Sequence, residues 1–198
     1  MNFNNKYYHG VENHTKNFYE ELKKVEKILS DHAILSRSLQ DSNIYSKISF
    51  NGNNYISLCH GIIGKYIEHS AYNLFVKNSI SLIINENLPD VINLNLLKRN
   101  ISSYNESELL YFSNDNNKVR YTDLVDEVQV EDLISSNYFD GIGLPVDYIL
   151  KNERRKMFLV EYFYHLQEFL KENKYNFKIY DIDNQVPVNE EYILKKIK

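Results

Sequence analysis

Two short stretches of the sequence combine residue types that can do chemistry. His9 and Gly10 close the aromatic run YYHGV, and Glu127 opens the run EVQVE. An imidazole transfers protons near neutral pH, a glycine lets a ligand approach the backbone, and a carboxylate stabilises positive charge. Each residue alone also has an ordinary explanation: a strand end, a turn, or a solvated strand face shared by Glu127 and Glu131. Only their combination, order and spacing indicate a site.

Common nucleotide and metal signatures are missing from the sequence. It contains no P-loop, no GxGxxG opening a helix, no HExxH and no GxSxG. The histidines are scattered without the spacing of a ligand set, so we expect no metal site. Cys59 adjoins His60, but neighbours in a strand point to opposite faces and a free cysteine is usually a small buried hydrophobe. A cysteine nucleophile is therefore not expected.

Composition limits the class of protein. The chain has 198 residues, 43% of them hydrophobic, which is enough to bury the core of one domain spanning residues 1–198. A net charge of −4 gives no broad basic field for nucleic acid, which would need a local patch. A single cysteine excludes a disulfide framework, and no run is long and apolar enough for a signal peptide or a membrane span. We therefore expect a cytoplasmic protein without membrane partners.

Apolar periodicity predicts the elements that position these residues. Alternating or continuous apolar runs predict strands, and apolar residues three to four apart predict helices. Polar NDNNK at 114–118 predicts a loop between two further strands. The mixture predicts an α+β fold. The expected strands are Tyr7–Val11, Tyr55–Cys59, Ser79–Ile84 and those in FDGIGLP and NFKIYDI, and the expected helices follow Thr15, span Tyr66–Val76 and run from Arg155 to Asn173.

Three blocks in this order resemble the signature blocks of NAD-dependent ADP-ribosyltransferases with a His-Tyr-Glu triad. They are YYHGV at 7–11, NNYISLCHGIIGKYIEHSAYNLF at 53–75 and DEVQVEDLI at 126–134. Poly(ADP-ribose) polymerases and diphtheria-type toxins belong to this family, and DarT-type enzymes share its fold. The resemblance implies a mixed β-sheet core with flanking helices and NAD as co-substrate.

The same resemblance implies roles for individual residues. His9, Tyr55 and Glu127 would form the catalytic triad, with His9 bonded to the nicotinamide ribose and Glu127 as the catalytic carboxylate. The remaining cofactor contacts would come from Gly10, Ser70 and Tyr72: Gly10 presents its backbone to the carboxamide, Ser70 lies near it, and Tyr72 stacks on the nicotinamide ring.

The chain departs from the family pattern in ways that leave alternatives open. Val11 follows His-Gly where the family often has Thr or Ser, which removes a hydroxyl from the nicotinamide site. Ser70 and Tyr72 lie closer together than in the polymerases, so Tyr66 is an alternative stacking residue. Glu131, in the order Gln-x-Glu, is the second choice for the catalytic carboxylate.

The resemblance implies transfer of ADP-ribose from NAD to a macromolecular acceptor, either nucleic acid or protein. A bacterial or phage toxin or effector is the expected setting, with an antitoxin or inhibitor protein as a further partner. DNA, RNA and protein remain open as acceptors. The alternative is a non-catalytic relative that keeps the fold to bind a nucleotide or a protein.

Overall fold

The structure, a computed structural model, describes residues 1–11, 18–36, 39–40, 55–67, 70–89, 91–93, 126–151 and 153–197. Within these residues, strands and helices are mixed along the chain, and the predicted α+β class is confirmed. The strand predicted before the 114–118 loop and the cap at Thr15 lie outside the described residues. Of the strand predicted after the loop, over residues 118–130, only 126–130 are described, and this end forms most of β6.

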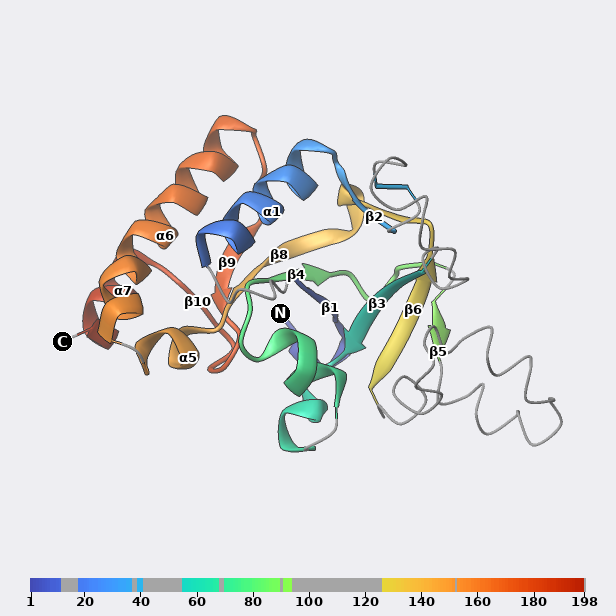
Figure 1. The fold of residues 1–198 in the computed structure, drawn as a ribbon, viewed down its shortest axis with the longest axis horizontal. Helices are drawn as coiled ribbons and strands as arrows, with labels where there is room; N and C mark the ends of the chain where they lie inside the picture. Colours follow the sequence, from blue (N-terminus) through green and yellow to red (C-terminus); the bar gives the residue numbers. More distant parts are fainter. Residues whose placement is uncertain are drawn as a thin grey trace, which may run out of the picture.

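A mixed sheet forms the centre of the molecule, with strand order β10-β9-β8-β4-β1-β3-β6-β5 (Figure 1). Neighbouring strands are antiparallel except for the parallel pair β8–β9. The ribbon formed by β2 (Ala33–Leu35) and β7 (Leu133–Ser135) makes a separate small sheet. The strands of the main sheet are β1 Tyr7–Gly10, β3 Tyr55–His60, β4 Ser81–Ile84, β5 Ile92–Asn93, β6 Glu127–Glu131, β8 Phe139–Leu144, β9 Lys178–Asp181 and β10 Val186–Pro187.

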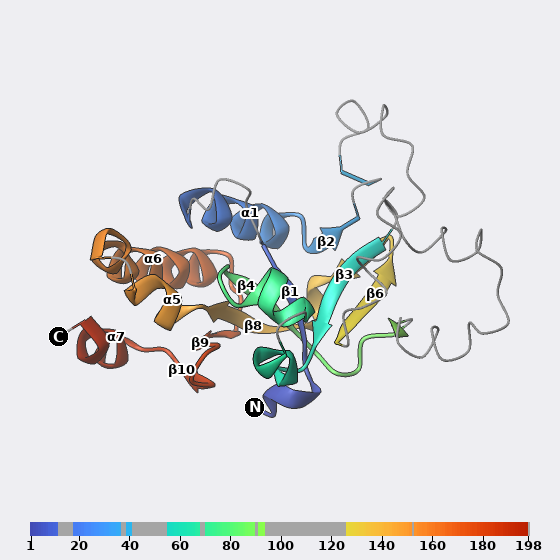
Figure 2. The same cartoon turned by 60° about the horizontal axis from the view of Figure 1, so that its bottom comes forward.

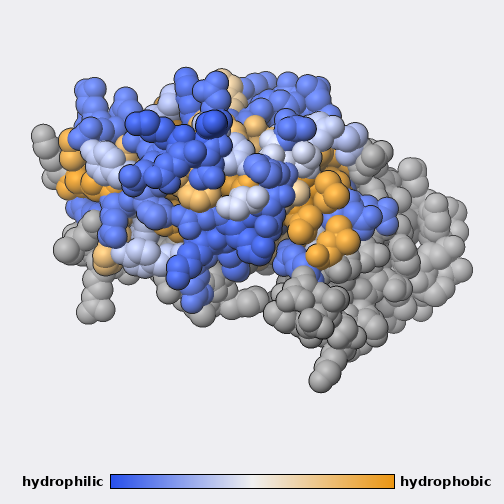
Figure 3. Space-filling view, turned by 90° about the horizontal axis from the view of Figure 1, so that it is seen from above, coloured by the Kyte–Doolittle hydropathy of each residue, from blue (hydrophilic) through white to orange (hydrophobic). Residues whose placement is uncertain are grey.

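Helices α1 (Phe18–Ser30) and α6 (Glu153–Glu172) lie side by side over one face of the sheet (Figures 1 and 2). The Tyr19 hydroxyl donates to Glu161 across this pair at 3.2 Å. Seen from above, the outer surface of this layer is mostly hydrophilic (Figure 3), as amphipathic helices require. The other helical segments are η1 Phe3–Asn5, η3 Ile63–Tyr66, η4 Tyr72–Val76, η6 Ser136–Tyr138, α5 Val146–Leu150 and α7 Glu190–Ile197.

Side chains alternate along each strand, so the sheet has a buried cluster on each face. Leu58, Leu82 and Ile142 pack in the cluster beneath α1 and α6. Tyr8, Cys59 and other residues on the opposite face pack with Tyr72 and Val76 of η4. A residue's position along its strand therefore decides whether it faces α1 and α6 or η4.

The predicted helix Tyr66–Val76 is wrong as a single α-helix. The described part consists of a 3-10 turn, η3, and a π-helical turn, η4, closed by the bond from Lys77 N to Tyr72 O at 2.9 Å. The amide of Asn73 donates to the Gly64 and Ile67 carbonyls, at 2.9 and 2.6 Å, and so replaces regular backbone bonds. Side-chain bonds of this kind have no periodic signature in the sequence.

The predicted amphipathic face of α6 is confirmed by burial. Leu159 and Leu166 are 0% exposed, and Phe163 is 1% exposed. We expect Leu166→Ala to destabilise the protein by roughly 2 to 5 kcal/mol, because it leaves a cavity beneath the helix. Urea unfolding measures this change. Leu194→Ala in α7 is the matched control, since Leu194 is 41% exposed; equal losses in the two variants would contradict the packing of α6.

Candidate functional site

Glu127 occupies the first position of β6, directly opposite Cys59 of β3. Its residue surface is only 1% exposed. Neither carboxylate oxygen has a hydrogen-bond partner in the described structure. Buried polar groups are normally paired, so an unpaired buried carboxylate needs a specific explanation. The ordinary explanation of a solvated strand face is therefore wrong for Glu127, whereas Glu131 is exposed as that explanation predicts.

Burial raises the pKa of Glu127 from its ordinary 4.5 to about 7. Ser57 and Gln129 oppose this change because their side chains favour the carboxylate, and the nearby charge of Asp126 adds to it. The side chains of Ser57 and Gln129 lie near the carboxylate and favour its ionised form, although neither makes a hydrogen bond to it in the described structure. Glu127 therefore changes charge near neutral pH, a common property of catalytic carboxyl groups.

The preceding residue, Asp126, is also buried but fully engaged. Its carboxylate accepts hydrogen bonds from the backbone amides of Ala71 and Tyr72, at 2.7 and 3.1 Å, and from the Cys59 thiol at 3.2 Å. Asp126 thus caps the start of η4 and joins it to β6 and β3. Its role is structural, and sequence reasoning missed it because its partners lie far away along the chain.

Gly10 ends β1 beside η4. A side chain here would place its Cβ 1.7 Å from the Phe75 carbonyl oxygen, so only glycine fits. In the described strands the β1–β3 ladder covers Tyr7 and Tyr8, whereas the β1–β4 ladder continues to Gly10. Val11 N donates to Ile80 O toward β4, so by alternation the peptide groups of Gly10 point toward β3, beyond the end of that ladder.

His9 does not lie on the same face of the sheet as Glu127. It pairs with Leu82, which packs beneath α1 and α6, whereas Glu127 pairs with Cys59 on the η4 face. The His9 Nδ1 atom lies 3.3 Å from the Ser57 carbonyl oxygen, where β1 and β3 have separated. Burial lowers the pKa of His9, and the hydrogen bond to the Ser57 carbonyl partly offsets this change. The predicted meeting of His9 and Glu127 is therefore corrected: sequence order does not reveal strand register.

Ser70 and Tyr72 are both buried within the fold. Ser70 Oγ donates to the Gly64 carbonyl at 2.6 Å and accepts from Asn73 N at 3.1 Å. Tyr72 is 0% exposed and packs in the core, so its ring offers no surface for stacking in this structure. The alternative aromatic, Tyr66, is 81% exposed. The prediction that Tyr72 stacks on nicotinamide is therefore corrected by burial.

Tyr55 begins β3, and its backbone pairs with Glu131. Its side chain lies outside the described part of the structure, so its triad role stays a prediction. Cys59 is a buried thiol whose pKa is raised well above its usual range, chiefly by burial. This environment agrees with the expectation that Cys59 is not a nucleophile.

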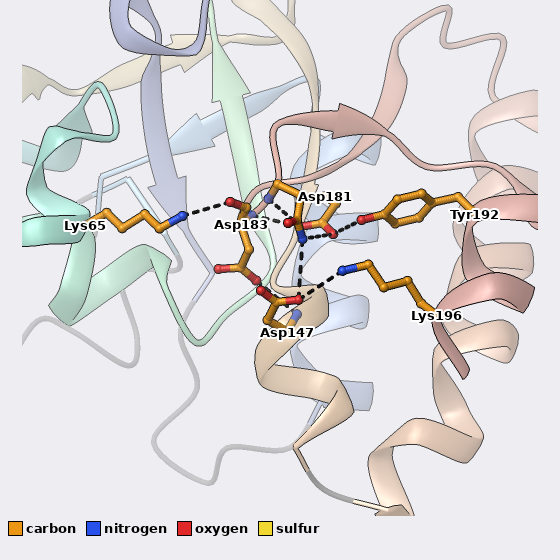
Figure 4. A network of polar contacts seen from close by, with 7 residues as sticks. Lys65, Asp147, Asp181, Asp183, Tyr192 and Lys196 are labelled. Atoms are coloured by element: carbon orange, nitrogen blue, oxygen red, sulfur yellow. Dashed lines mark hydrogen bonds and ion pairs between the residues drawn. The ribbon is translucent and has the colours of Figure 1, made fainter. Parts of the chain in front are cut away.

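A second polar network fixes η3 against the far end of the sheet (Figure 4). Asp181 of β9 is 0% exposed and accepts from the backbone amides of Asp183 and Asn184, at 2.9 and 3.1 Å. Lys65 of η3 donates to the Asp183 carbonyl at 2.9 Å. The members are Lys65, Asp147, Asp181, Asp183, Asn184, Tyr192 and Lys196. The polar turn DIDN was the available sequence signal for this network.

Searches against protein-family models, curated proteins and solved structures find no match to this chain. Among the described residues, no three or more His, Cys, Asp or Glu side chains are grouped to hold a metal ion. None of the described helices is both long and apolar enough to cross a membrane.

Proposed function

We propose that this protein is an NAD-dependent ADP-ribosyltransferase whose catalytic carboxylate is Glu127. The observation that supports this most is the buried carboxylate without a partner at the start of β6. A fold keeps such a group at a cost in stability, which is typical of functional sites. The resemblance of three ordered sequence blocks to this family is the second support. We place the activity in the cytoplasm, in a bacterial or phage toxin or effector.

The chemistry of NAD suits an unpaired buried carboxylate. The nicotinamide ring is a flat cation, and its positive charge passes to the ribose as the glycosidic bond breaks. A fixed carboxylate stabilises that charge more in the transition state than in the ground state. Glu127, which has no neighbouring cation in the described structure to neutralise it, is free to serve this role.

The proposed transfer needs no reactant besides NAD and the acceptor. The bond between nicotinamide nitrogen and ribose C1′ breaks, and its electron pair leaves with nicotinamide. The acceptor nucleophile forms a new bond to C1′ and gives its proton to the Glu127 carboxylate, which returns the proton to water. A carboxyl group with a pKa of about 7 can accept that proton at neutral pH.

Gly10 retains its proposed place beside nicotinamide. Its peptide groups point toward the region where β1 and β3 separate, next to Ser57. Backbone amide and carbonyl groups in this position can bind a carboxamide without a side chain in between. Tyr55 retains the proposed triad position, and Tyr66 replaces Tyr72 as the proposed stacking aromatic because its ring is exposed.

The proposal makes turnover depend on pH in a defined direction. Only ionised Glu127 can stabilise the ribose cation, so turnover should rise as pH increases through about 7, the pKa of Glu127 in the folded protein. Initial rates of nicotinamide release between pH 5.5 and 9 would measure this. A rate that falls across this range would contradict a catalytic carboxylate.

Non-catalytic binding of a nucleotide or protein is the second candidate. The separation of His9 and Glu127 onto opposite faces of the sheet favours it, because the complete triad is not assembled. A binder would be stabilised by NAD in a thermal melt but would release no nicotinamide. An enzyme would do both.

The acceptor would be identified by incubating host lysate with the protein and NAD labelled in its adenylate part. Mass spectrometry of the protein, DNA and RNA fractions then locates any added ADP-ribose. We expect labelling of one macromolecular fraction with wild type and with Glu131→Gln, since Glu131 is exposed. Labelling that is unchanged in Glu127→Gln would exclude the proposed mechanism. A co-purifying antitoxin or inhibitor that suppresses labelling would support the toxin setting.

A further inference from the structure

Two uncharged polar residues adjoin Glu127 on its own face of the sheet. The β3–β6 register places Ser57 opposite Gln129, and Cys59 opposite Glu127. Alternation puts all four side chains on the η4 face, two residues apart along each strand. Gln129 is 6% exposed, and its Nε2 atom donates a hydrogen bond to Ser57 Oγ at 3.5 Å. A short polar chain therefore lies next to the carboxylate.

Ser57 and Gln129 can supply the hydrogen-bond donors that the Glu127 carboxylate lacks. When Gln129 donates to Ser57 Oγ, the hydroxyl proton of Ser57 remains available for another acceptor. The amide of Gln129 also has a second N–H. Hydrogen bonds donated to an ionised carboxyl group favour its charged form. Both carboxylate oxygens of Glu127 are buried acceptors without partners in the described structure.

We propose that Ser57 and Gln129 are positioning residues that hold the Glu127 carboxylate and favour its ionised form. This inference rests on the proposed function for its catalytic meaning, but neither residue is assigned a role by the family resemblance. Their hydrogen bonds would form as Glu127 loses its proton, fixing its oxygens in a single orientation. The reacting carboxylate would then be ordered at the pH where it becomes active.

Two titratable neighbours face Glu127 among the described residues. Asp126 immediately precedes β6, and Cys59 pairs with Glu127 from β3. The charge of Asp126 raises the pKa of Glu127. The Cys59 thiol stays protonated near neutral pH because burial raises its pKa. Neither group changes in variants of Ser57 or Gln129, so a changed titration of Glu127 reports the polar pair.

The test is a carbon-13 NMR titration of the glutamate side-chain carboxyl groups, with Glu127→Gln identifying the Glu127 signal. Ser57→Ala and Gln129→Met should each move the midpoint of the Glu127 titration upward by about 0.5 pH or more. Ser81→Ala is the matched control. Ser81 is a buried serine of the same sheet, two strands from Ser57, and should leave the midpoint unchanged.

Unchanged or lowered midpoints in both variants would overturn the proposal. Should Ser57→Ala not fold, Gln129→Met alone decides. The titration needs no NAD, so it separates the two hypotheses. If the midpoint moves in a protein without turnover, the role of Ser57 and Gln129 is supported and the enzymatic function is rejected. If turnover is normal but the midpoints do not move, the enzymatic function is supported and the role of Ser57 and Gln129 is rejected. In an active protein, both variants should lose turnover at pH 7 and regain most of it at pH 9.

Discussion

Glu127→Gln is expected to make the folded protein more stable at pH 8 while slowing turnover of NAD by about 100- to 1,000-fold. The turnover falls because glutamine keeps the size of the side chain but lacks the charge that stabilises the ribose cation. The stability rises because the fold buries a carboxylate without partners. One substitution should therefore move stability and activity in opposite directions, which is typical of a functional residue.

The direction of the stability effect follows from the pKa. The folded protein holds the Glu127 proton more tightly than the unfolded chain, with a pKa of about 7 against 4.5. The stability linked to Glu127 is thus fully present below pH 4.5 and is lost as pH rises through about 7. At pH 8 the penalty is on the order of 3 kcal/mol, which the glutamine variant avoids.

Urea unfolding of wild type and Glu127→Gln at pH 5 and pH 8 measures this effect. The difference between the two proteins should be small at pH 5 and large at pH 8. Glu131→Gln is the control from the exposed end of the same strand and should follow wild type at both pH values. A Glu127→Gln protein that is less stable than wild type at pH 8 would contradict this expectation, because it would show that the interactions of the ionised carboxylate outweigh the cost of burying it.

Gly10→Ala is expected to destabilise the protein by at least about 3 kcal/mol. The new Cβ would lie 1.7 Å from the Phe75 carbonyl oxygen and 3.0 Å from Ser79 Oγ. Since the first of these is a backbone atom, either β1 or η4 must move. Urea unfolding at fixed pH measures the loss. Reduced NAD binding in this variant would then follow from the damaged fold as well as from any nicotinamide contact.

Gly143→Ala is the matched control for Gly10→Ala. Its Cβ would meet mainly Ser81 Oγ, at 2.5 Å, and a serine hydroxyl can rotate away. We expect a smaller loss there. A Gly10→Ala protein with wild-type stability would contradict the close packing of β1 on η4. If such a protein also lost NAD affinity, the ligand contact alone, and not the packing of β1 on η4, would explain the need for glycine at position 10.

The spacing of apolar residues along the sequence was sufficient to predict the helices and strands that flank the site. The apolar spacing of Leu22, Val25 and Leu29 predicted α1, and the run from Leu159 to Leu170 predicted α6. Strands β1, β3 and β8 also appear close to their predicted limits. Such segments bury one face over several turns or residues, so their period is visible without knowledge of their partners.

The geometry of the site could not be predicted because it depends on pairing between distant segments. The alternation in EVQVE is equally typical of a solvated strand face, but Glu127 at the start of that face is buried whereas Glu131 at its end is exposed. The separation of His9 from Glu127 follows from strand register. Capping of η4 by Asp126 joins residues more than fifty positions apart. The short elements β2, β5, β7, β10, α5 and α7 were also not predicted, because few residues show their period.

The central claim is tested most directly by nicotinamide release from NAD at pH 8, measured for purified wild type and Glu127→Gln with lysate as the source of acceptor. The proposal predicts release by wild type, with ADP-ribose appearing on a macromolecule, and a rate about 100- to 1,000-fold lower for Glu127→Gln. Wild-type protein that binds NAD yet releases no nicotinamide, or a Glu127→Gln rate equal to that of wild type, would contradict it.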